Sequence, residues 1–350
     1  MGYTSGAVNK VISYSDEFME CGLIGLILLS FFFKKVRLSR AEYRILYCYV
    51  IFALMGLLSN VVYPMQSWFL NLSDLLVCSR FLVFYYAVRI LLPGYTDSRE
   101  LLLSLTKACR VVAIVLFTLA IHDLLLDPIF PKRDFRYFMY SLQLCFPHPT
   151  YLAVTCVTCS CVLMAAMEYC QNTTEYKINF VCLALGLFIT IFTLRSKAIA
   201  AVACIFLLYC LIIKWKVQSR ALLLSGGGLL ATIIGWDQML FYFTTNVEEF
   251  VRARLLRDAV VLASSRFPLG TGFATFGSAI AATHYSTLYV KLGYNSLYGG
   301  SKNDPRYLCD TFWGTVIAQN GWIGTLAFLG IVIGLIVVVM NIPWKSKYLF

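Results

Sequence analysis

Two basic residues, Arg195 and Lys197, interrupt an apolar stretch that runs from residue 178 to residue 213. This stretch is about twice the roughly 20 residues that cross a bilayer as one helix, and a charge inside the membrane is costly unless it meets water or a partner. We therefore expect two transmembrane helices joined by a short charged turn at 193–198. Two cations there could bind phosphate oxygens. The alternative is a solvated hairpin tip that binds nothing.

A second basic group lies in a stretch whose periodicity predicts a helix up to about Ala263, with a start at Asn246 that resembles a capping box. Arg254 and Arg257 fall on one face of this helix. Guanidinium groups bind phosphate oxygens in a bidentate manner, and a diphosphate leaving group needs its developing charge neutralised. The alternative for Arg254 is a surface ion pair with Asp258, four residues later.

Candidate residues for proton transfer and sugar binding follow. Asp310 stands at the start of the last predicted span, where a positioned carboxylate can accept a proton or can simply cap the helix. His284 is a second candidate acceptor, although a single loop histidine can equally be an ordinary surface residue. Tyr285 and Tyr289 offer rings on which the apolar faces of sugars could stack. The alternative for these tyrosines is an aromatic belt at the membrane interface.

The amino-acid composition indicates that these candidate residues belong to a membrane protein. The chain has 350 residues, of which 60% are hydrophobic and only 13% are charged, and its mean hydropathy is +0.75. These values exclude an ordinary soluble domain. The net charge of +11 is typical of basic cytoplasmic loops that face anionic lipids, so we expect membrane lipids and no nucleic acid as partners.

The apolar pattern predicts an all-α polytopic protein, a single membrane domain over 1–350 with about nine transmembrane helices. Basic clusters at 34–40, 214–220 and 345–347 place those loops in the cytoplasm. The N-terminus is then outside, the C-terminus is cytoplasmic, and a long extracytoplasmic loop spans 237–309 before the last helix. The first span follows acidic residues and is expected to be retained, not cleaved as a signal peptide. The nine predicted spans are 18–33, 43–63, 75–92, 111–126, 151–169, 178–194, 198–213, 222–236 and 311–340.

The thirteen cysteines do not predict a metal site. All but Cys309 lie in or beside apolar spans, where cysteine packs as a small hydrophobe. The cluster of Cys156, Cys159 and Cys161 is therefore interpreted as helix packing, since the three histidines stand at no ligand spacing. We expect no metal and no cofactor.

The order of several motifs resembles the bacterial O-antigen and capsular polysaccharide polymerases (the Wzy type), relatives of the O-antigen ligases. The resemblance covers roughly 191–329, and the N-terminal half is similar only in being hydrophobic. The motifs that carry it are Arg195-Ser196-Lys197-Ala198, Ala253-Arg254-Leu255-Leu256, Phe267-Pro268-Leu269-Gly270-Thr271-Gly272-Phe273, Tyr285-Ser286-Thr287-Leu288-Tyr289, Asp310-Thr311-Phe312-Trp313 and Gln319-Asn320-Gly321-Trp322-Ile323-Gly324.

This resemblance implies a GT-C-like fold and a metal-independent glycosyltransferase of the bacterial cytoplasmic (inner) membrane. The enzyme would join oligosaccharide repeat units carried on undecaprenyl diphosphate, with a flippase and a chain-length regulator as protein partners. Arg195 and Arg254 would hold the diphosphate, and Asp310 would take or orient the proton of the acceptor hydroxyl. The residues expected to contact substrate are Lys197, Arg257, His284, Tyr285 and Tyr289.

Two other functions remain open from the sequence. Ligases commonly carry a histidine at the place of Asp310, so the aspartate favours a polymerase over a ligase. A lipid-linked oligosaccharide flippase or another transporter would show inverted repeats, broken helices and charge near the midplane. Arg80 is the one charge that fits the transporter, although no internal repeat is evident in the sequence.

Overall fold

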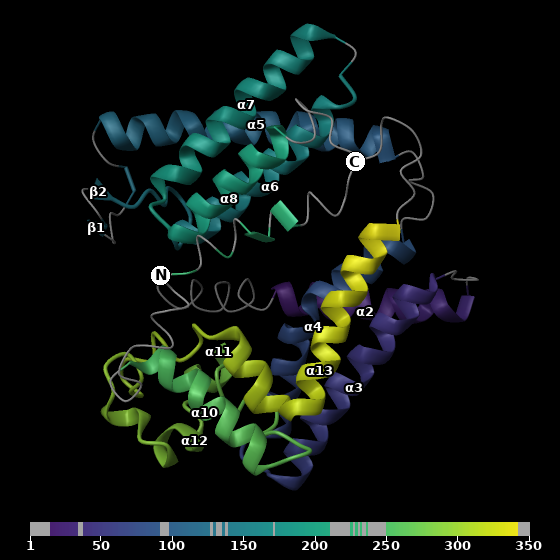
Figure 1. Cartoon of the computed structure of the whole chain (residues 1–350), viewed down its shortest axis with the longest axis vertical. Coiled ribbons are helices and arrows are strands. Elements are labelled where there is room, and N and C mark those ends of the chain that lie inside the picture. The colour runs from purple at the N-terminus through teal and green to yellow at the C-terminus, as the bar shows by residue number, and fades with distance from the viewer. Residues whose placement is uncertain are drawn as a thin grey trace, which may run out of the picture. The chain divides into compact units, whose positions relative to one another are not determined.

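The computed structural model describes residues 15–33, 38–91, 98–126, 129–130, 135–136, 139–170, 172–210, 225–226, 228–229, 232, 236 and 250–341. The chain forms two compact units (Figure 1). The first combines Met1–Pro93 with Leu240–Ile342, and the second combines Gly94–Met239 with Pro343–Phe350. The single membrane domain expected from the sequence stays a prediction.

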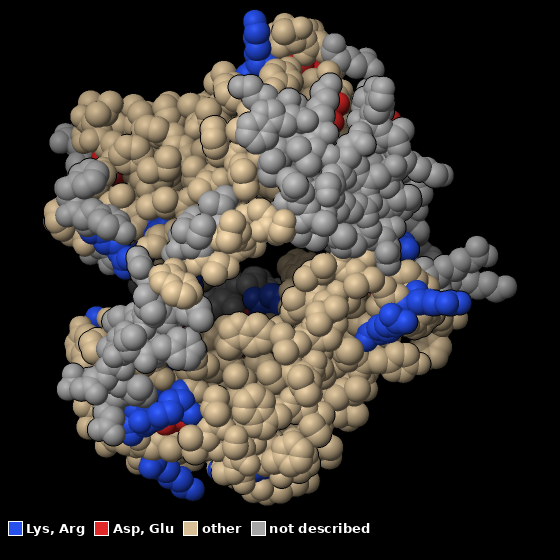
Figure 2. All heavy atoms as spheres, in the orientation of Figure 1, with Lys and Arg blue, Asp and Glu red and all other residues tan. Residues whose placement is uncertain are grey.

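The chain is mostly helical and has the character of a membrane-embedded protein. Both units present broad uncharged surfaces on the visible face (Figure 2), as expected for helices that contact lipid. Five helices in the described part of the chain are long and apolar enough to cross a membrane: Arg40–Val62, Glu100–Leu125, Pro149–Met167, Thr173–Phe192 and Phe312–Val338. The all-α membrane class is thus confirmed in outline, whereas the count of nine spans stays a prediction. Most of the predicted span at 222–236 lies outside the described residues.

The first unit is built on α2 (Ser15–Phe33), α3 (Arg40–Val62), α4 (Trp68–Leu91) and α13 (Phe312–Asn341). Ile45 and Phe52 of α3 and Ile331 of α13 are among its buried core side chains. Arg80 of α4 forms ion pairs with Glu17 and Glu20 of α2, with N–O distances of 3.6 and 3.3 Å. The charge that favoured a transporter is therefore neutralised between two helices.

Helix α13 is broken at Gly321, whose backbone angles are φ 65° and ψ −172°. The segment that precedes α11 fits into this break. Thr271 N–H donates to the carbonyl of Ala318 at 2.7 Å, and Gly272 N–H donates to the carbonyl of Gln319 at 2.9 Å. These bonds satisfy carbonyls that the interrupted helix leaves open, which is the condition for irregular backbone at membrane depth. Two motifs that are distant in the sequence therefore pack against each other.

The part of the predicted long loop that the structure describes is folded, not extended. It contains α10 (Val251–Ser265), α11 (Ala279–Thr283), α12 (Thr287–Lys291) and the 3-10 helix η2 (Tyr294–Ser296). Leu255 and Leu262 of α10 pack with Phe276 and Leu308 in one core. The predicted helix up to about Ala263 is thus present, while its predicted cap at Asn246 lies outside the described residues.

The second unit contains α5 (Ser98–Leu125), α6 (Pro149–Met167), α7 (Thr173–Phe192) and α8 (Ser196–Leu208). A short antiparallel hairpin, β1 (Phe135–Arg136) and β2 (Met139–Tyr140), interrupts the helical pattern between α5 and α6. Cys156 and Cys159 are buried, as expected for helix packing, whereas Cys161 is exposed.

Candidate functional site

The charged turn lies between two helices, as the sequence predicts. Helix α7 ends at Phe192 and α8 begins at Ser196. Leu194 adopts a positive φ of 52°, which is uncommon for a branched side chain and costs on the order of 1 kcal/mol or more. Arg195 follows as the N-cap of α8 and makes no side-chain cap hydrogen bond. The turn therefore combines a strained backbone with an arginine that does not cap its own helix.

His148, which the sequence analysis did not select, meets Arg195. His148 is the N-cap of α6, and its ring nitrogen Nδ1 accepts a hydrogen bond from Thr150 N–H at 3.2 Å. The other ring nitrogen, Nε2, lies 3.2 Å from Arg195 Nη2. Because Nδ1 is an acceptor, the proton of the neutral ring is assigned to Nε2, and a guanidinium has only N–H donors. Two basic side chains therefore share one place, which suits an anion.

The backbone adds to the positive character of this place. Both His148 and Arg195 are N-caps, so the N-termini of α6 and α8 meet there. Helix N-termini carry unsatisfied N–H groups and the positive end of the helix dipole, and they bind phosphate groups in many proteins. Lys197, in the first turn of α8, is exposed. We call His148, Arg195, Lys197 and these two N-termini the basic corner.

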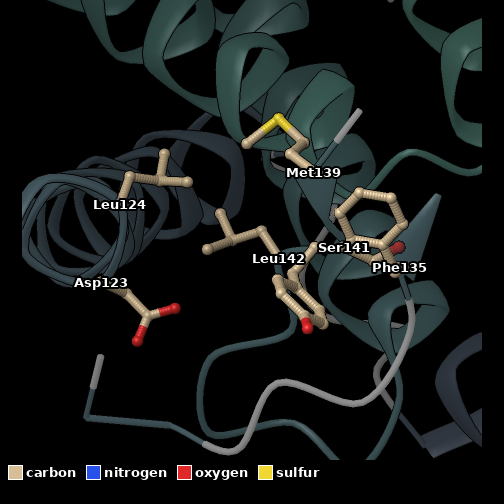
Figure 3. A pocket seen from close by; sticks show the side chains of 7 residues that line it. Asp123, Leu124, Phe135, Met139, Ser141 and Leu142 are labelled. Atoms are coloured by element: carbon tan, nitrogen blue, oxygen red, sulfur yellow. The ribbon is translucent and has the colours of Figure 1, made fainter. Parts of the chain in front are cut away.

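A cavity of about 310 Å³ lies in the same unit (Figure 3). It is lined by Asp123 and Leu124 of α5 together with Phe135, Met139, Tyr140, Ser141 and Leu142. Leu142 N–H donates to the carbonyl of Phe192 at 2.9 Å, so the cavity wall is tied to the end of α7, three residues before Arg195. Aromatic rings beside a carboxylate and a hydroxyl suit a ligand that has both apolar faces and hydroxyl groups, such as a sugar.

In the first unit, Arg254 and Arg257 share one carboxylate. Asp258 is buried and lies 3.5 Å from Arg254 Nε and 3.2 Å from Arg257 Nε. Arg254 also donates to the carbonyl of Leu292, and its guanidinium lies 5.3 Å from the ring centre of Tyr294. The pair of Arg254 with Asp258, the alternative weighed from the sequence, is thus present within α10. The bond of Arg254 to Leu292 and a hydrogen bond from Tyr294 to Asp258 at 3.0 Å connect α10 to the segment after α12. Arg254 and Arg195 belong to different units, so their joint role stays a prediction.

Asp310 has an arginine partner that the sequence did not indicate. Arg252 Nε donates to Asp310 Oδ2 at 2.7 Å, and Arg252 Nη2 contacts the same oxygen. The two side chains are 46% and 33% exposed, so a substrate can reach them. The Arg252 guanidinium also lies 4.8 Å from the ring centre of Tyr307. An exposed carboxylate that is held in place by an arginine is a plausible proton acceptor once substrate displaces or shares that arginine.

The tyrosines expected to bind sugar are placed differently. Tyr289 is 0% exposed and Tyr285 is 9% exposed, and both belong to the core of the loop segment. Tyr289 accepts a hydrogen bond from Gly277 N–H at 2.7 Å, and Tyr285 donates to the carbonyl of Gly300 at 3.1 Å. They therefore form no sugar-stacking surface, because short turns fold them inward. His284 is exposed at the C-cap of α11.

Sequence reasoning missed His148, Arg252 and Asp123. A signal existed for His148, since a polar residue followed by proline is a common start of a helix. The pair of Arg252 with Asp310 joins residues 58 positions apart, and no local pattern could show it. In the part of the chain that the structure describes, no group of three or more His, Cys, Asp or Glu side chains is placed to hold a metal ion.

Comparisons of the chain with protein-family models, with curated proteins and with solved structures find no match.

Proposed function

We propose that this chain is a GT-C-like membrane glycosyltransferase, a polysaccharide polymerase that joins repeat units carried on undecaprenyl diphosphate. The observation that supports this most directly is the basic corner, where His148 Nε2 and Arg195 Nη2 meet at 3.2 Å beside two helix N-termini. The oxygens of a lipid diphosphate are the kind of group that basic side chains and helix N-termini bind. We place the reaction at the outer face of the bacterial cytoplasmic membrane, following the charge distribution of the sequence.

The basic corner would act on the leaving group. In the reaction, the oxygen of an acceptor hydroxyl forms a bond with the anomeric carbon of the donor glycan. The bond from that carbon to the diphosphate oxygen breaks, and the diphosphate leaves with the electron pair. Arg195, His148 and Lys197 would stabilise the charge that develops on it. The cavity beside Asp123 would hold a sugar of the same lipid-linked glycan, since cavity and basic corner lie in one unit.

The proton of the acceptor hydroxyl would pass to a carboxylate, and Asp310 is our candidate. Its pairing with Arg252 fixes the orientation of the carboxylate, and a general base must be positioned in this way. Arg254 and Arg257 would position the loop segment through Asp258, and Tyr285 and Tyr289 would support it from inside. His284 is the second candidate acceptor. A ligase would catalyse the same kind of glycan transfer but to a different acceptor molecule.

A reconstituted assay tests the proposal. The purified full-length chain is placed in liposomes with an undecaprenyl-diphosphate-linked repeat unit and a metal chelator, and with no other protein. We expect longer lipid-linked glycans, detected by mass spectrometry. Transbilayer movement of the labelled lipid without any longer glycan would contradict the proposal.

A transporter is the second candidate function, and the break of α13 at Gly321 is the observation that favours it. Broken helices recur at the binding sites of transporters. Against this alternative, Arg80 is paired with two glutamates of α2, and the loop segment fills the break with hydrogen bonds. The liposome assay separates the two functions, because it reports lipid movement and glycan length independently.

A further inference from the structure

A buried carboxylate in the first unit has no arginine or lysine in an ion pair with it among the described residues. Asp74 of α4 is 1% exposed. Its Oδ2 accepts hydrogen bonds from Ala274 N–H at 2.6 Å and from Gln319 Nε2 at 3.0 Å. The Ser278 side chain also hydrogen-bonds to this carboxylate. All three donors are neutral, so they orient the carboxylate without cancelling its charge. A buried charge left in this state is strongly unfavourable, and it requires a counter-charge or a proton.

Buried side chains of α3, α4 and α13 supply oxygen atoms that have no hydrogen-bond partner. Gln319 donates through its amide nitrogen to Asp74 and to the carbonyl of Phe276 at 2.9 Å, which fixes the amide so that Oε1 is the free atom. Oδ1 of Asn71, one turn before Asp74 on α4, is buried without a partner, as are the side-chain oxygens of Asn60 and Asn320. These four side chains are at most 3% exposed. Asn60 Nδ2 is the one unpaired donor among these side chains, against four unpaired amide oxygens. This excess of acceptors marks a place for a cation.

The unpaired oxygens of Asn60 and Gln319 belong to helices α3 and α13, which both contact residues 270–276, the segment that fills the break in α13. We call this region of contact the seam. A Cβ atom on Gly272 would lie only 1.7 Å from Asn60 Oδ1, so the asparagine oxygen lies directly against that segment. Ala274, which donates to Asp74, stands two residues further on. Asn320 lies at the end of the first half of α13, where a helix C-terminus carries partial negative charge.

We propose that this seam binds one monovalent cation of the size of sodium, held by the Asp74 carboxylate and the amide oxygens of Gln319 and Asn60. A single carboxylate neutralises one positive charge, whereas calcium sites usually gather several carboxylates among six to eight oxygens. Unwound backbone and buried amide oxygens are the ligands that sodium takes at broken membrane helices. The ion would fasten α4 to α13 and to the segment at 270–276. This role is separate from the proposed glycan transfer.

Thermal unfolding of the purified full-length protein in detergent tests the site. The Tm is measured in sodium, potassium, calcium and choline chloride at equal ionic strength, so that charge screening is constant. An ion that binds only the folded state raises the Tm in a saturable way. We expect a rise of roughly 4 °C or more in sodium relative to choline, with smaller rises in potassium and calcium. An equal Tm in sodium and choline overturns the proposal and means that Asp74 carries a proton. A larger rise in calcium overturns the choice of ion.

Two variants test whether the sodium-dependent rise in Tm depends on Asp74 and Asn60. Asp74→Asn removes the charge and keeps the shape, so the sodium response should vanish while the Tm in choline stays at or above that of the parent. Asn60→Ala should raise the sodium concentration for half of the effect roughly tenfold or more. The matched control is Asp304→Asn, since that carboxylate is paired with Arg306 at the surface and its loss should leave the response intact. A sodium response that survives in Asp74→Asn would exclude Asp74 as a ligand. If that variant does not fold, the salt series on the parent and Asn60→Ala decide the question.

Discussion

At the scale of single residues, Arg195 Nη2 and His148 Nε2 lie 3.2 Å apart, so two basic side chains share one place. Thr150 N–H donates to Nδ1 of the ring, and Leu194, the residue before the arginine, has a strained backbone. Strain of this kind persists where the surrounding structure enforces it, commonly at binding sites. We therefore expect the two side chains to act as a pair on one phosphate group.

The first prediction concerns this pair. Arg195→Ala should lower the rate of glycan elongation by roughly 10²-fold or more, the effect of losing a preorganised donor to a developing oxyanion. Arg195→Lys keeps the charge and loses the planar fork, so it should retain part of the activity. The measurement is the elongation rate in liposomes at matched protein levels. Full activity in Arg195→Ala would remove the turn from the mechanism.

His148 gives the second prediction. His148→Ala should lower the elongation rate, because one N–H donor to the diphosphate is lost. His148→Gln replaces that donor by an amide N–H and should recover most of the rate, whereas a residue that only caps α6 would be replaced equally well by asparagine. The comparison of the glutamine and asparagine variants, with KM and kcat measured separately, distinguishes diphosphate binding from capping. Lys302→Ala, which changes an exposed side chain in the other unit, is the control.

Asp310 carries the third prediction. If it accepts the proton of the attacking hydroxyl, Asp310→Asn should lower the elongation rate by roughly 10²-fold or more, and Asp310→His should be partly active. Asp304→Asn is the matched control, since it also removes a carboxylate that pairs with an arginine of the loop segment. An active Asp310→Asn variant would leave Asp310 as a structural partner of Arg252 and would move the acceptor role to His284.

At the scale of elements, the segment that fills the break of α13 has little room for change. A Cβ atom on Gly270 would lie 2.4 Å from the carbonyl oxygen of Gln319 and 2.5 Å from that of Ala318. Gly270→Ala should therefore lower the free energy of unfolding by about 1–3 kcal/mol, the usual cost of overpacking. Thermal unfolding in detergent measures the effect. Gly22→Ala in α2, where a Cβ atom would meet nothing within 4 Å, should be neutral or slightly stabilising.

The elements were largely predictable because apolar periodicity and interrupting charges are local signals. The turn at Arg195 and the helix that carries Arg254 both appear where the sequence places them. The inward folding of Tyr289 could not be predicted, because it depends on turns whose stability comes from packing with α10. The same holds for Asp74, whose partners Ala274 and Gln319 come from the other end of the chain.

At the scale of the whole molecule, the orientation in the membrane is the fifth prediction. In a background where Cys309 is the only cysteine, a membrane-impermeant maleimide added outside should label it, while Ser39→Cys in the cysteine-free chain should stay unlabelled. Burial and the neighbouring Asp310 carboxylate raise the pKa of the Cys309 thiol. Since the thiolate is the reactive form, labelling of Cys309 should be slow near neutral pH and should accelerate as the pH rises toward that pKa. Labelling at Ser39→Cys without labelling at Cys309 would reverse the orientation.

The first unit takes its helices from both ends of the chain, and this has a consequence for biogenesis. Asp74 and the Gln319 amide that holds it are 245 residues apart. At a synthesis rate of about 5–20 residues per second, the ribosome adds Gln319 roughly 12–50 s after Asp74. During that interval α3 and α4 carry a carboxylate and several amides that have not yet met their partners. We therefore expect the insertion machinery to retain these helices until α13 emerges, and quality-control proteases to degrade chains that are truncated before it.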